Sequence, residues 1–382
     1  MIKIILLSAG VWLSLAIGFG VLAVFRSSII ALLVEICWIL IPFLSWGSQW
    51  LVRTKVKGSI HIYAVTSSKQ AVKGSIVLGN SSVFSASKIY LRLKVSNRLT
   101  GEISESIFKM SVPAKSQCEE YFELTAKNCG YLVVEISKVY FMDWFGFLPV
   151  PGKIDAVGKV SVLPETFSSN ITLRLSSATA EDAQAWSQIK KGQDQSEIFG
   201  LRDYVQGDSI KQIHWKLSSK RQQLIVKEPS LPIEKSLLIF WDKNTRASNA
   251  EVMNALAECV ASVSQEILGQ GISYTLGWTE ELQLVYENID TDDQLFQTIP
   301  RMLKHGADVS GDSGAFLYNQ SRNYHNFGKV IYIAETIPED FVSFGEADMS
   351  LVLCDRDAAS DQWPVIYFDT KNYEEDLETI EL

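Results

Sequence analysis

The sequence has few of the residues that build metal centres and disulfide frameworks. Its 382 residues include five cysteines and four histidines, and none of them stands at the spacing of a zinc site. The cysteines lie far apart, which suits a reducing compartment. No P-loop, no H-E-x-x-H and no glycine-rich dinucleotide motif occurs outside the apolar N-terminus. These absences disfavour zinc hydrolases, phosphate-cradling enzymes and disulfide-stapled domains.

Acidic side chains are unevenly distributed along the chain. Residues 1–199 hold 20 basic and 14 acidic side chains, whereas residues 228–382 hold 9 basic and 28 acidic ones. So large a change in the sign of the net charge indicates that the basic N-terminal half lies near an anionic partner or surface. It also indicates that the acidic C-terminal region lies in solvent. The acidic region disfavours nucleic acid as a ligand of that part.

Two long apolar runs open the chain. Residues 4–25 form a run of 22 without a charge, and residues 27–52 carry the single charge of Glu35. About 20 helical residues suffice to cross the hydrocarbon core. A cleavable signal peptide has a shorter apolar region and is not followed at once by a second span. The sequence therefore predicts a retained two-helix transmembrane hairpin over residues 1–52, with the lipid bilayer as its first partner.

The charges that flank the two runs predict an orientation. Only Arg26 lies at the tip of the hairpin, while four cations lie on the other side: Lys3, Arg53, Lys55 and Lys57. The positive-inside rule then places both termini, and the soluble domains, in the cytoplasm of a multi-pass membrane protein. Glu35 is interpreted as a carboxyl near the outer interface, neutral or paired with Arg26, although a proton-relay or oligomerisation role stays open.

Residues 53–165 show a period of two. The pattern is clearest from Lys88 to Val95, where apolar and polar side chains alternate. Further strands are expected at residues 60–65, 75–78, 107–112, 120–124, 132–139 and 159–163. About seven short strands separated by turn residues predict a β-sandwich.

Residues 233–382 change to a pattern typical of an α/β domain. A strand over residues 237–241 precedes a helix that a Ser248-x-x-Glu251 capping box should begin and Gly269 should end. Two consecutive strands, at residues 272–278 and 282–286, interrupt the alternation of strands and helices. Pro300 should break or kink the helix that starts at Asp292. Strands at 330–334, 351–354 and 365–368 and an acidic helix from Tyr373 complete a Rossmann-like domain with a largely buried sheet.

The segment that links these domains, residues 166–232, contains the most distinctive stretch. Residues 200–228 read GLRDYVQGDSIKQIHWKLSSKRQQLIVKE. This order resembles the signature of the bacterial "domain of unknown function 58" family, R-x-Y-x-x-G-D-x-x-R-x-I-x-W with a trailing V-K-E, and Lys211 replaces the usual arginine. Residues 129–131 and 143–147 are similar to the family's R-G-Y and D-P-F-G-L segments, with Trp144 where proline is common.

The resemblance implies an architecture and partners. It implies two N-terminal membrane helices, a β-sandwich, the signature segment and a C-terminal domain like von Willebrand factor A, in the bacterial cytoplasmic membrane. It also implies partnership with a MoxR-type AAA+ ATPase, often beside membrane transglutaminase-like proteins. It supplies no established catalytic activity.

The signature segment holds the candidate binding residues: Arg202, Asp203, Tyr204, Gly207, Asp208, Lys211, Trp215 and Lys216. Gly207 and Asp208 are expected to turn into a helix, with Trp215 at the domain junction. One interpretation has Arg202 and Asp203 forming ion pairs that fix this turn. The other has a basic patch that docks an acidic partner or an anion and is formed by Arg202, Lys211, Lys216, Lys220 and Arg221. Nucleic acid is disfavoured because the patch lacks clustered aromatic side chains.

A von Willebrand A domain usually carries D-x-S-x-S after its first strand, where it holds Mg²⁺ or Mn²⁺. Here residues 242–246 read Asp-Lys-Asn-Thr-Arg, so Asp242 and Asn244 are the remaining ligand candidates. The positive charges of Lys243 and Arg246 oppose the binding of a metal ion.

Residues 311–314, Gly-Asp-Ser-Gly, lack the spacing of a nucleophile elbow and are interpreted as a loop.

These observations predict a non-enzymatic, membrane-anchored platform that faces the cytoplasm and works with a MoxR-type ATPase. Two alternatives stay open. The α/β domain could be a Mg²⁺- or Mn²⁺-dependent adhesion-type module or an uncharacterised enzyme, or the soluble domains could face the cell exterior.

Overall fold

The computed structural model of the chain describes residues 10–21, 29–62, 65–67, 71–173, 186–191, 198–203, 214, 217–218, 220, 224–232, 236–245, 249–281, 283–307, 312–320, 327–339, 341–345, 347–354 and 363–382. The chain divides into two compact units. The first comprises Met1–Glu165 with Pro300–Gly306, and the second comprises Thr166–Ile299 with Ala307–Leu382.

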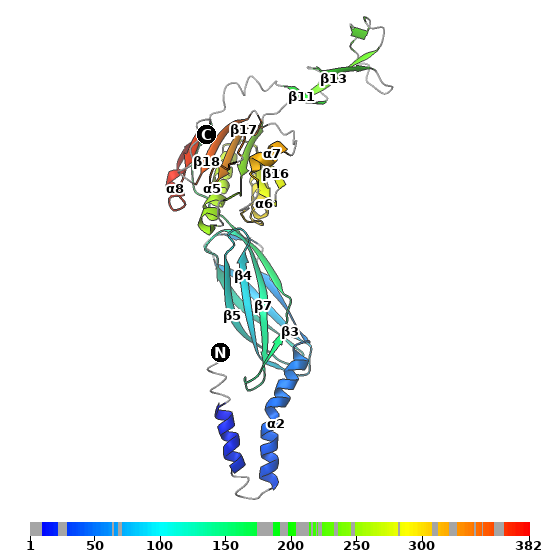
Figure 1. The fold of residues 1–382 in the computed structure, drawn as a ribbon, viewed down its shortest axis with the longest axis vertical. Helices are drawn as coiled ribbons and strands as arrows, with labels where there is room; N and C mark the ends of the chain where they lie inside the picture. The colour runs from blue at the N-terminus through cyan, green and yellow to red at the C-terminus, as the bar shows by residue number, and fades with distance from the viewer. Residues whose placement is uncertain are drawn as a thin grey trace. The chain divides into compact units, whose positions relative to one another are not determined.

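The first unit begins with two apolar helices, Gly10–Val21, drawn in dark blue in Figure 1, and α2 (Ile29–Val52), drawn in a lighter blue. The 24 residues of α2 give a length of about 36 Å at 1.5 Å per residue, enough for a hydrocarbon core of about 30 Å. Its outward side chains are apolar and exposed, as at Ile29 (80%) and Leu44 (71%). Among the described residues, α2 is the one helix long and apolar enough to cross a membrane.

The two helices pack against each other through aromatic rings. The indoles of Trp12 and Trp38 stack with centroids 6.3 Å apart, and Phe19 contacts the same Trp38 ring. Gly20 allows a close approach, because a Cβ there would lie 2.4 Å from Oε1 of Glu35. The Glu35 carboxyl therefore lies against the neighbouring helix. Arg26, its expected partner, is outside the described residues.

Two β-sheets follow in the first unit. One has the order β1-β3-β6, with β1 (Val56–Ile62), β3 (Ala71–Asn80) and β6 (Ser116–Thr125). The other has the order β2-β9-β7-β4-β5, with β2 (Val65–Ser67), β9 (Val157–Leu163), β7 (Gly130–Met142), β4 (Ala86–Asn97) and β5 (Ile103–Val112), and β8 (Pro149–Gly152) pairs with β7. Six of the seven strands expected from the period of two are present, several of them longer than predicted. The strand expected over residues 60–65 was wrong, because β1 ends at Ile62 in one sheet and β2 begins at Val65 in the other. The short β8 was not predicted.

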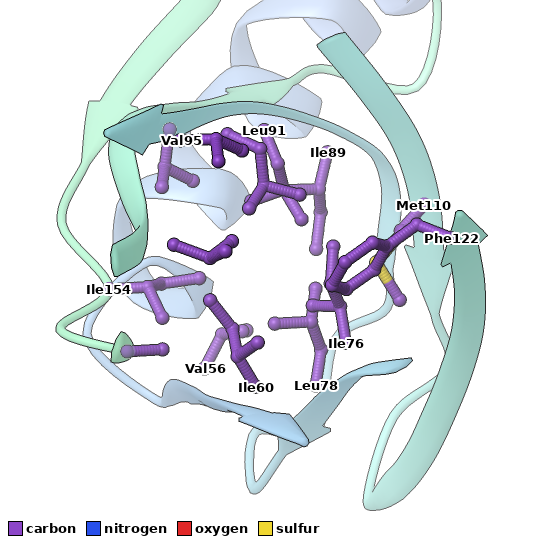
Figure 2. Close-up of a cluster of buried hydrophobic side chains, with 14 of the residues drawn as sticks. Val56, Ile60, Ile76, Leu78, Ile89, Leu91, Val95, Met110, Phe122 and Ile154 are labelled. Carbon is purple, nitrogen blue, oxygen red and sulfur yellow. The ribbon is translucent and has the colours of Figure 1, made fainter. Parts of the chain in front are cut away.

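The two sheets share one apolar core, which makes this region a sandwich. Ile60 and Ile76 of the first sheet and Ile89 and Leu91 of the second point into the same interior (Figure 2). Ile76, Ile89 and Leu91 have no exposed surface. Each such side chain contributes about 1.5 to 3 kcal/mol on burial. The alternation along β4 thus reflects one buried and one wetter face.

Helix α2 is hydrogen-bonded directly to the sandwich. The Gln49 amide donates to the Ser85 carbonyl at 3.2 Å, and Ser45 Oγ accepts the Trp144 N–H at 2.7 Å. One turn later, the Arg53 guanidinium donates to the Pro151 carbonyl at 3.1 Å. The C-terminal turns of α2 are therefore part of the folded unit and position it on the sandwich.

The second unit is built on a six-stranded sheet with the order β16-β15-β14-β17-β18-β19. These strands are β14 (Ser236–Trp241), β15 (Tyr274–Glu280), β16 (Gln283–Ile289), β17 (Phe327–Ala334), β18 (Asp348–Leu353) and β19 (Val365–Tyr367). All neighbours pair in parallel except β16, which is antiparallel to β15. The helices are α5 (Ala250–Gly269), α6 (Asp292–Met302), α7 (Gly314–Gln320) and α8 (Tyr373–Asp376).

Two smaller sheets complete this unit. Strand β10 (Asn170–Thr172) pairs in parallel with β20 (Thr379–Glu381). Strands β11 (Trp186–Lys191), β12 (Ile198–Asp203) and β13 (Ile225–Pro232) form a three-stranded sheet with β13 in the middle.

Some sequence expectations for this unit were wrong in detail. The N-cap of α5 is Asn249, whose Oδ1 accepts the Glu251 N–H at 3.0 Å, rather than Ser248 one residue earlier. Pro300 lies in the last turn of α6 and does not break the helix, which continues to Met302; the alternative of a kink stays a prediction. Only one helical hydrogen bond depends on the missing N–H there. Helix α7 was not predicted, because its seven residues are too short for a visible period.

Candidate functional site

The signature segment is only partly described. Arg202 and Asp203 lie on β12, where their backbones pair with Val226 and Ile225 of β13. The other candidate binding residues lie outside the described residues: Tyr204, Gly207, Asp208, Lys211, Trp215 and Lys216. The expected turn and the basic patch therefore stay predictions.

His214 holds the end of this segment to β13. Its backbone N–H donates to the Ile225 carbonyl at 2.8 Å, and Ser218 Oγ accepts the Ile225 N–H at 2.9 Å. The His214 Nδ1 accepts the Leu217 N–H at 3.2 Å. These contacts give His214 a structural role.

The carboxyl edge of the six-stranded sheet is a second place where function is expected. The chain leaves β14 through α5 to reach β15 on one side, and later reaches β17 on the other side. This reversal is a topological switch point, where α/β proteins place ligands and protein contacts. Asp242 follows β14 immediately and lies at this point.

Asp242 is fully buried and receives hydrogen bonds from three segments of the chain. Its Oδ1 accepts the Asn244 N–H at 2.9 Å, and its Oδ2 accepts the Gly314 N–H at 2.8 Å. The hydroxyl of Tyr332, on β17, also donates to Oδ2. A buried carboxylate is tolerated when donors surround it in this way. Asp242 thus joins the ends of β14 and β17 to the start of α7.

Gly314 allows the start of α7 to lie this close to the sheet. A Cβ at this position would lie 2.2 Å from Cε1 of Phe240, which stacks on Tyr332. Ser313 precedes the helix, and its Oγ accepts the Phe316 N–H at 3.1 Å. Asp312 and Ser313 form part of a connecting segment, as the loop interpretation expected, but Gly314 already belongs to a helix. Ser313 therefore caps α7 and has no nucleophile-elbow geometry.

Lys243 follows Asp242 directly and is also buried. Only 1% of its surface is exposed, and its ammonium lies 4.9 Å from the centroid of the Trp241 ring. Burial lowers the pKa of Lys243 to about 7, and the nearby Glu280 carboxylate opposes part of that shift. The Glu280 carboxylate in turn accepts the Trp278 indole N–H at 3.2 Å. Lys243 therefore lies near Trp241 and the Glu280 carboxylate.

The residues at this edge do not fit a Mg²⁺ or Mn²⁺ site. Such an ion needs oxygen ligands with free lone pairs. Here the Asp242 carboxylate is surrounded by hydrogen-bond donors, and the backbone of Lys243 donates to Thr279 Oγ1, the nearest hydroxyl on β15. Among the described residues no three His, Cys, Asp or Glu side chains are grouped as a metal site. The geometry is that of a closed structural junction.

The residues that complete this junction were not predicted from the sequence. Gly314 and Tyr332 lie 72 and 90 residues after Asp242. No local pattern links three such distant positions. The one available signal was indirect, since parallel strands bring their carboxyl ends to the same edge of a sheet.

The two shorter family-like segments are the start of strand β7 and a turn in the first unit. Gly130 has a φ of +140°, and a Cβ there would lie 2.2 Å from Oδ1 of Asn97. Asp143 is fully buried, and its carboxylate accepts the N–H groups of Phe145 at 3.2 Å and Leu148 at 2.7 Å. Gly146, at φ +80°, completes this turn. Both segments therefore have a folding role.

Comparisons with known proteins leave the family open. No protein-family model matches the sequence, and no curated protein matches it. The solved structures that resemble part of the chain include the CARDB domain of a Pyrococcus furiosus protein with two metal ions, at 13% identity and a TM-score of 0.21, covering 28% of this chain and 87% of that one. A β-glucosidase from Listeria innocua has 12% identity and a TM-score of 0.22, covering 28% of this chain and 16% of that one. TM-scores this low show neither a shared fold nor a shared function.

Proposed function

We propose that this protein is a non-enzymatic platform that is anchored in the bacterial cytoplasmic membrane and assembles other proteins on its cytoplasmic side. The observation that carries the proposal is α2, an exposed apolar helix of 24 residues whose last turns are hydrogen-bonded into the sandwich. A folded soluble unit built onto such a helix is held at a membrane surface.

The proposed topology is a hairpin with both ends in the cytoplasm. The packing of Trp12 and Phe19 on Trp38 supports a first span beside α2. The cations Arg53, Lys55 and Lys57 directly after α2 support a cytoplasmic position for the soluble units.

The second unit is proposed as a von Willebrand A-like docking domain. Its strand order, with an antiparallel β16 at one edge of an otherwise parallel sheet, supports a Rossmann-like domain of that kind. Because Asp242 is internally satisfied, a protein partner is a better occupant of this edge than a metal ion. The sequence resemblance names a MoxR-type AAA+ ATPase as that partner and a transglutaminase-like membrane protein as a further one.

Co-purification from mild detergent tests this proposal. The full-length protein is expected to recover an AAA+ ATPase that mass spectrometry identifies, and Arg202→Ala is expected to reduce its recovery. Arg92→Ala is the matched control, because Arg92 forms an exposed ion pair with Glu105 on the sandwich. If no AAA+ protein is recovered, the proposal is contradicted. If the Arg202→Ala and Arg92→Ala variants recover equal amounts, the role of Arg202 is contradicted.

Calorimetric titration distinguishes the metal-dependent alternative. Mg²⁺ or Mn²⁺ added to the full-length protein in detergent is expected to release no binding heat at the Asp242 edge. A saturable heat that Asp242→Asn abolishes would revive the adhesion-type module.

A further inference from the structure

The end of the sandwich that joins α2 carries an excess of positive charge. Five connections meet there: residues 53–55, 81–85, 113–115, 143–148 and 153–156. Among these residues the cations are Arg53, Lys55, Lys115 and Lys153, and the carboxylates are Asp143 and Asp155. Asp143 is fully buried and bound to backbone N–H groups, so Asp155 is the exposed acid of this end.

Two hollows open at this end. One, of about 650 Å³, is lined by Arg53, Lys57 and Lys153, but Asp155 also lines it and pairs with Lys153 at 2.9 Å. The Arg53 guanidinium is already used, because it bonds the Pro151 carbonyl and lies 3.7 Å from the Trp50 ring. Of the cations of this hollow, Arg53 and Lys153 are thus already engaged, and Lys57 also lines the second hollow.

The second hollow, of about 750 Å³, is lined by three exposed lysines and by no carboxylate. Lys55 directly precedes β1, Lys57 lies at its start, and Lys115 comes from the turn between β5 and β6. Three ammonium groups around one open hollow suit a phosphate diester, which offers oxygen acceptors and one negative charge.

The backbone holds these three lysines in place. Ser81 donates to the Lys55 carbonyl through both its N–H, at 3.2 Å, and its hydroxyl, at 3.0 Å. The Lys115 N–H donates to the Ser82 carbonyl at 3.1 Å. The Asn80 amide braces the same loop by donating to the Phe84 carbonyl at 2.9 Å. The hollow is thus pre-organised, which lowers the entropy that a ligand must offset.

Lys115 also occupies an unfavourable backbone conformation. Its φ is +52°, in the left-handed region where glycine is the residue without strain. Only one other described non-glycine residue, Glu281, has a positive φ. A side chain kept at such a position suggests that its chemistry is used.

The position of the hollow identifies the source of the phosphate. Lys55 follows the end of α2 by three residues, and Trp50 and Arg53 mark the depth at which such side chains meet the bilayer interface. Phospholipid headgroups occupy that depth. We propose that Lys55, Lys57 and Lys115 bind the headgroup of an anionic phospholipid in the cytoplasmic leaflet, at the foot of the sandwich. This inference rests on the proposed function, since it requires α2 to span the bilayer.

Native mass spectrometry of the full-length protein in detergent tests the inference with dioleoyl phosphatidylglycerol and dioleoyl phosphatidylcholine as probes. The wild type is expected to bind phosphatidylglycerol more tightly. Each lysine lost should weaken this binding about fivefold, so the triple variant with Lys55, Lys57 and Lys115 changed to glutamine should lose about 100-fold. The matched control changes Lys73, Lys127 and Lys159 to glutamine, which alters net charge equally on strands and a loop away from α2, and should leave binding unchanged.

Lys115→Gly separates binding from folding. Glycine fits the backbone at φ +52°, so thermal stability should be retained while phosphatidylglycerol binding falls about fivefold. Lys115→Arg should retain the binding. Equal affinity for the two lipids, equal losses in the test and control triples, or unchanged binding by Lys115→Gly would overturn the inference.

Two further experiments distinguish a failure of the headgroup site from a failure of the membrane anchor. Inorganic phosphate in excess should not displace phosphatidylglycerol, and displacement would mean that the hollow takes free phosphate instead. Alkaline carbonate should leave the wild type in vesicles. Release by carbonate would contradict the membrane anchor itself, whereas retention without a lipid preference would overturn only the headgroup site.

Discussion

At the scale of single residues, Lys243 shows how burial can set a charge. Its ammonium is enclosed at the end of β14 between Trp241 and the Glu280 carboxylate, and burial lowers its pKa from 10.5 to about 7. In the unfolded chain the pKa returns to its ordinary value. Between pH 7 and 10.5 the unfolded state therefore binds more protons, and stability must rise with pH in that window.

Lys243→Met should remove this dependence. The variant is expected to be more stable than the wild type near pH 7, and its advantage should shrink by about 1.4 kcal/mol for each pH unit between 7 and 10. Denaturant unfolding of the full-length protein in detergent, monitored by tryptophan fluorescence, measures the difference. A wild type whose stability stays flat across this window would contradict the buried, titrating lysine.

Gly314→Ala tests the closed junction at Asp242. The new Cβ would lie 2.2 Å from Phe240, so α7 must move away from the sheet, and we expect a loss of about 1 to 3 kcal/mol in the free energy of unfolding. Gly269→Ala, at the end of α5 with no atom within 4 Å of the added Cβ, is the control. It should be neutral or gain up to about 1 kcal/mol. Similar losses in both variants would exclude the tight contact.

At the scale of elements, the residues 143–148 turn connects the sandwich to the apolar helices. The backbone N–H of Trp144 in this turn donates to Ser45 Oγ of α2. The rings of Phe147 and of Trp12, on the preceding helix, have centroids 6.0 Å apart. The Asp143 carboxylate fixes the turn internally. A family-like motif thus has a direct structural explanation.

Asp143→Ala should destabilise the first unit by about 1 to 3 kcal/mol, because two partly buried N–H groups lose their acceptor. Hydrogen exchange of peptides from residues 140–150 measures the loss. Asp155→Ala, at an exposed ion pair with Lys153, should change stability by less than about 1 kcal/mol. If the turn in the Asp143→Ala variant is protected from hydrogen exchange as strongly as in the wild type, the stabilising role of Asp143 is contradicted.

The elements were largely predictable from the sequence, but the site was not. Alternation along residues 88–95 located β4 to within two residues at each end, because one face of that strand is buried. Strand β8 and helix α7 are too short to show a period. The Asp242 junction was missed for a different reason, since Gly314 and Tyr332 reach it only through the strand order of the sheet.

At the scale of the whole molecule, the topology remains a prediction with a direct test. Cys118 on the sandwich and Cys354 in the second unit are half-buried thiols, whereas burial raises the pKa of Cys259 and keeps it unreactive. An impermeant maleimide should leave both Cys118 and Cys354 unlabelled in intact cells and label them after permeabilisation. Labelling in intact cells would place the soluble units outside.

The hydrogen bonds of Ser45, Gln49 and Arg53 have one more consequence. Since they attach α2 to the sandwich without a flexible linker, the helix and the sandwich must lean together. A thinner bilayer makes a long apolar helix lean further from the membrane normal. Bilayer thickness would then set the angle at which the sandwich stands on the membrane.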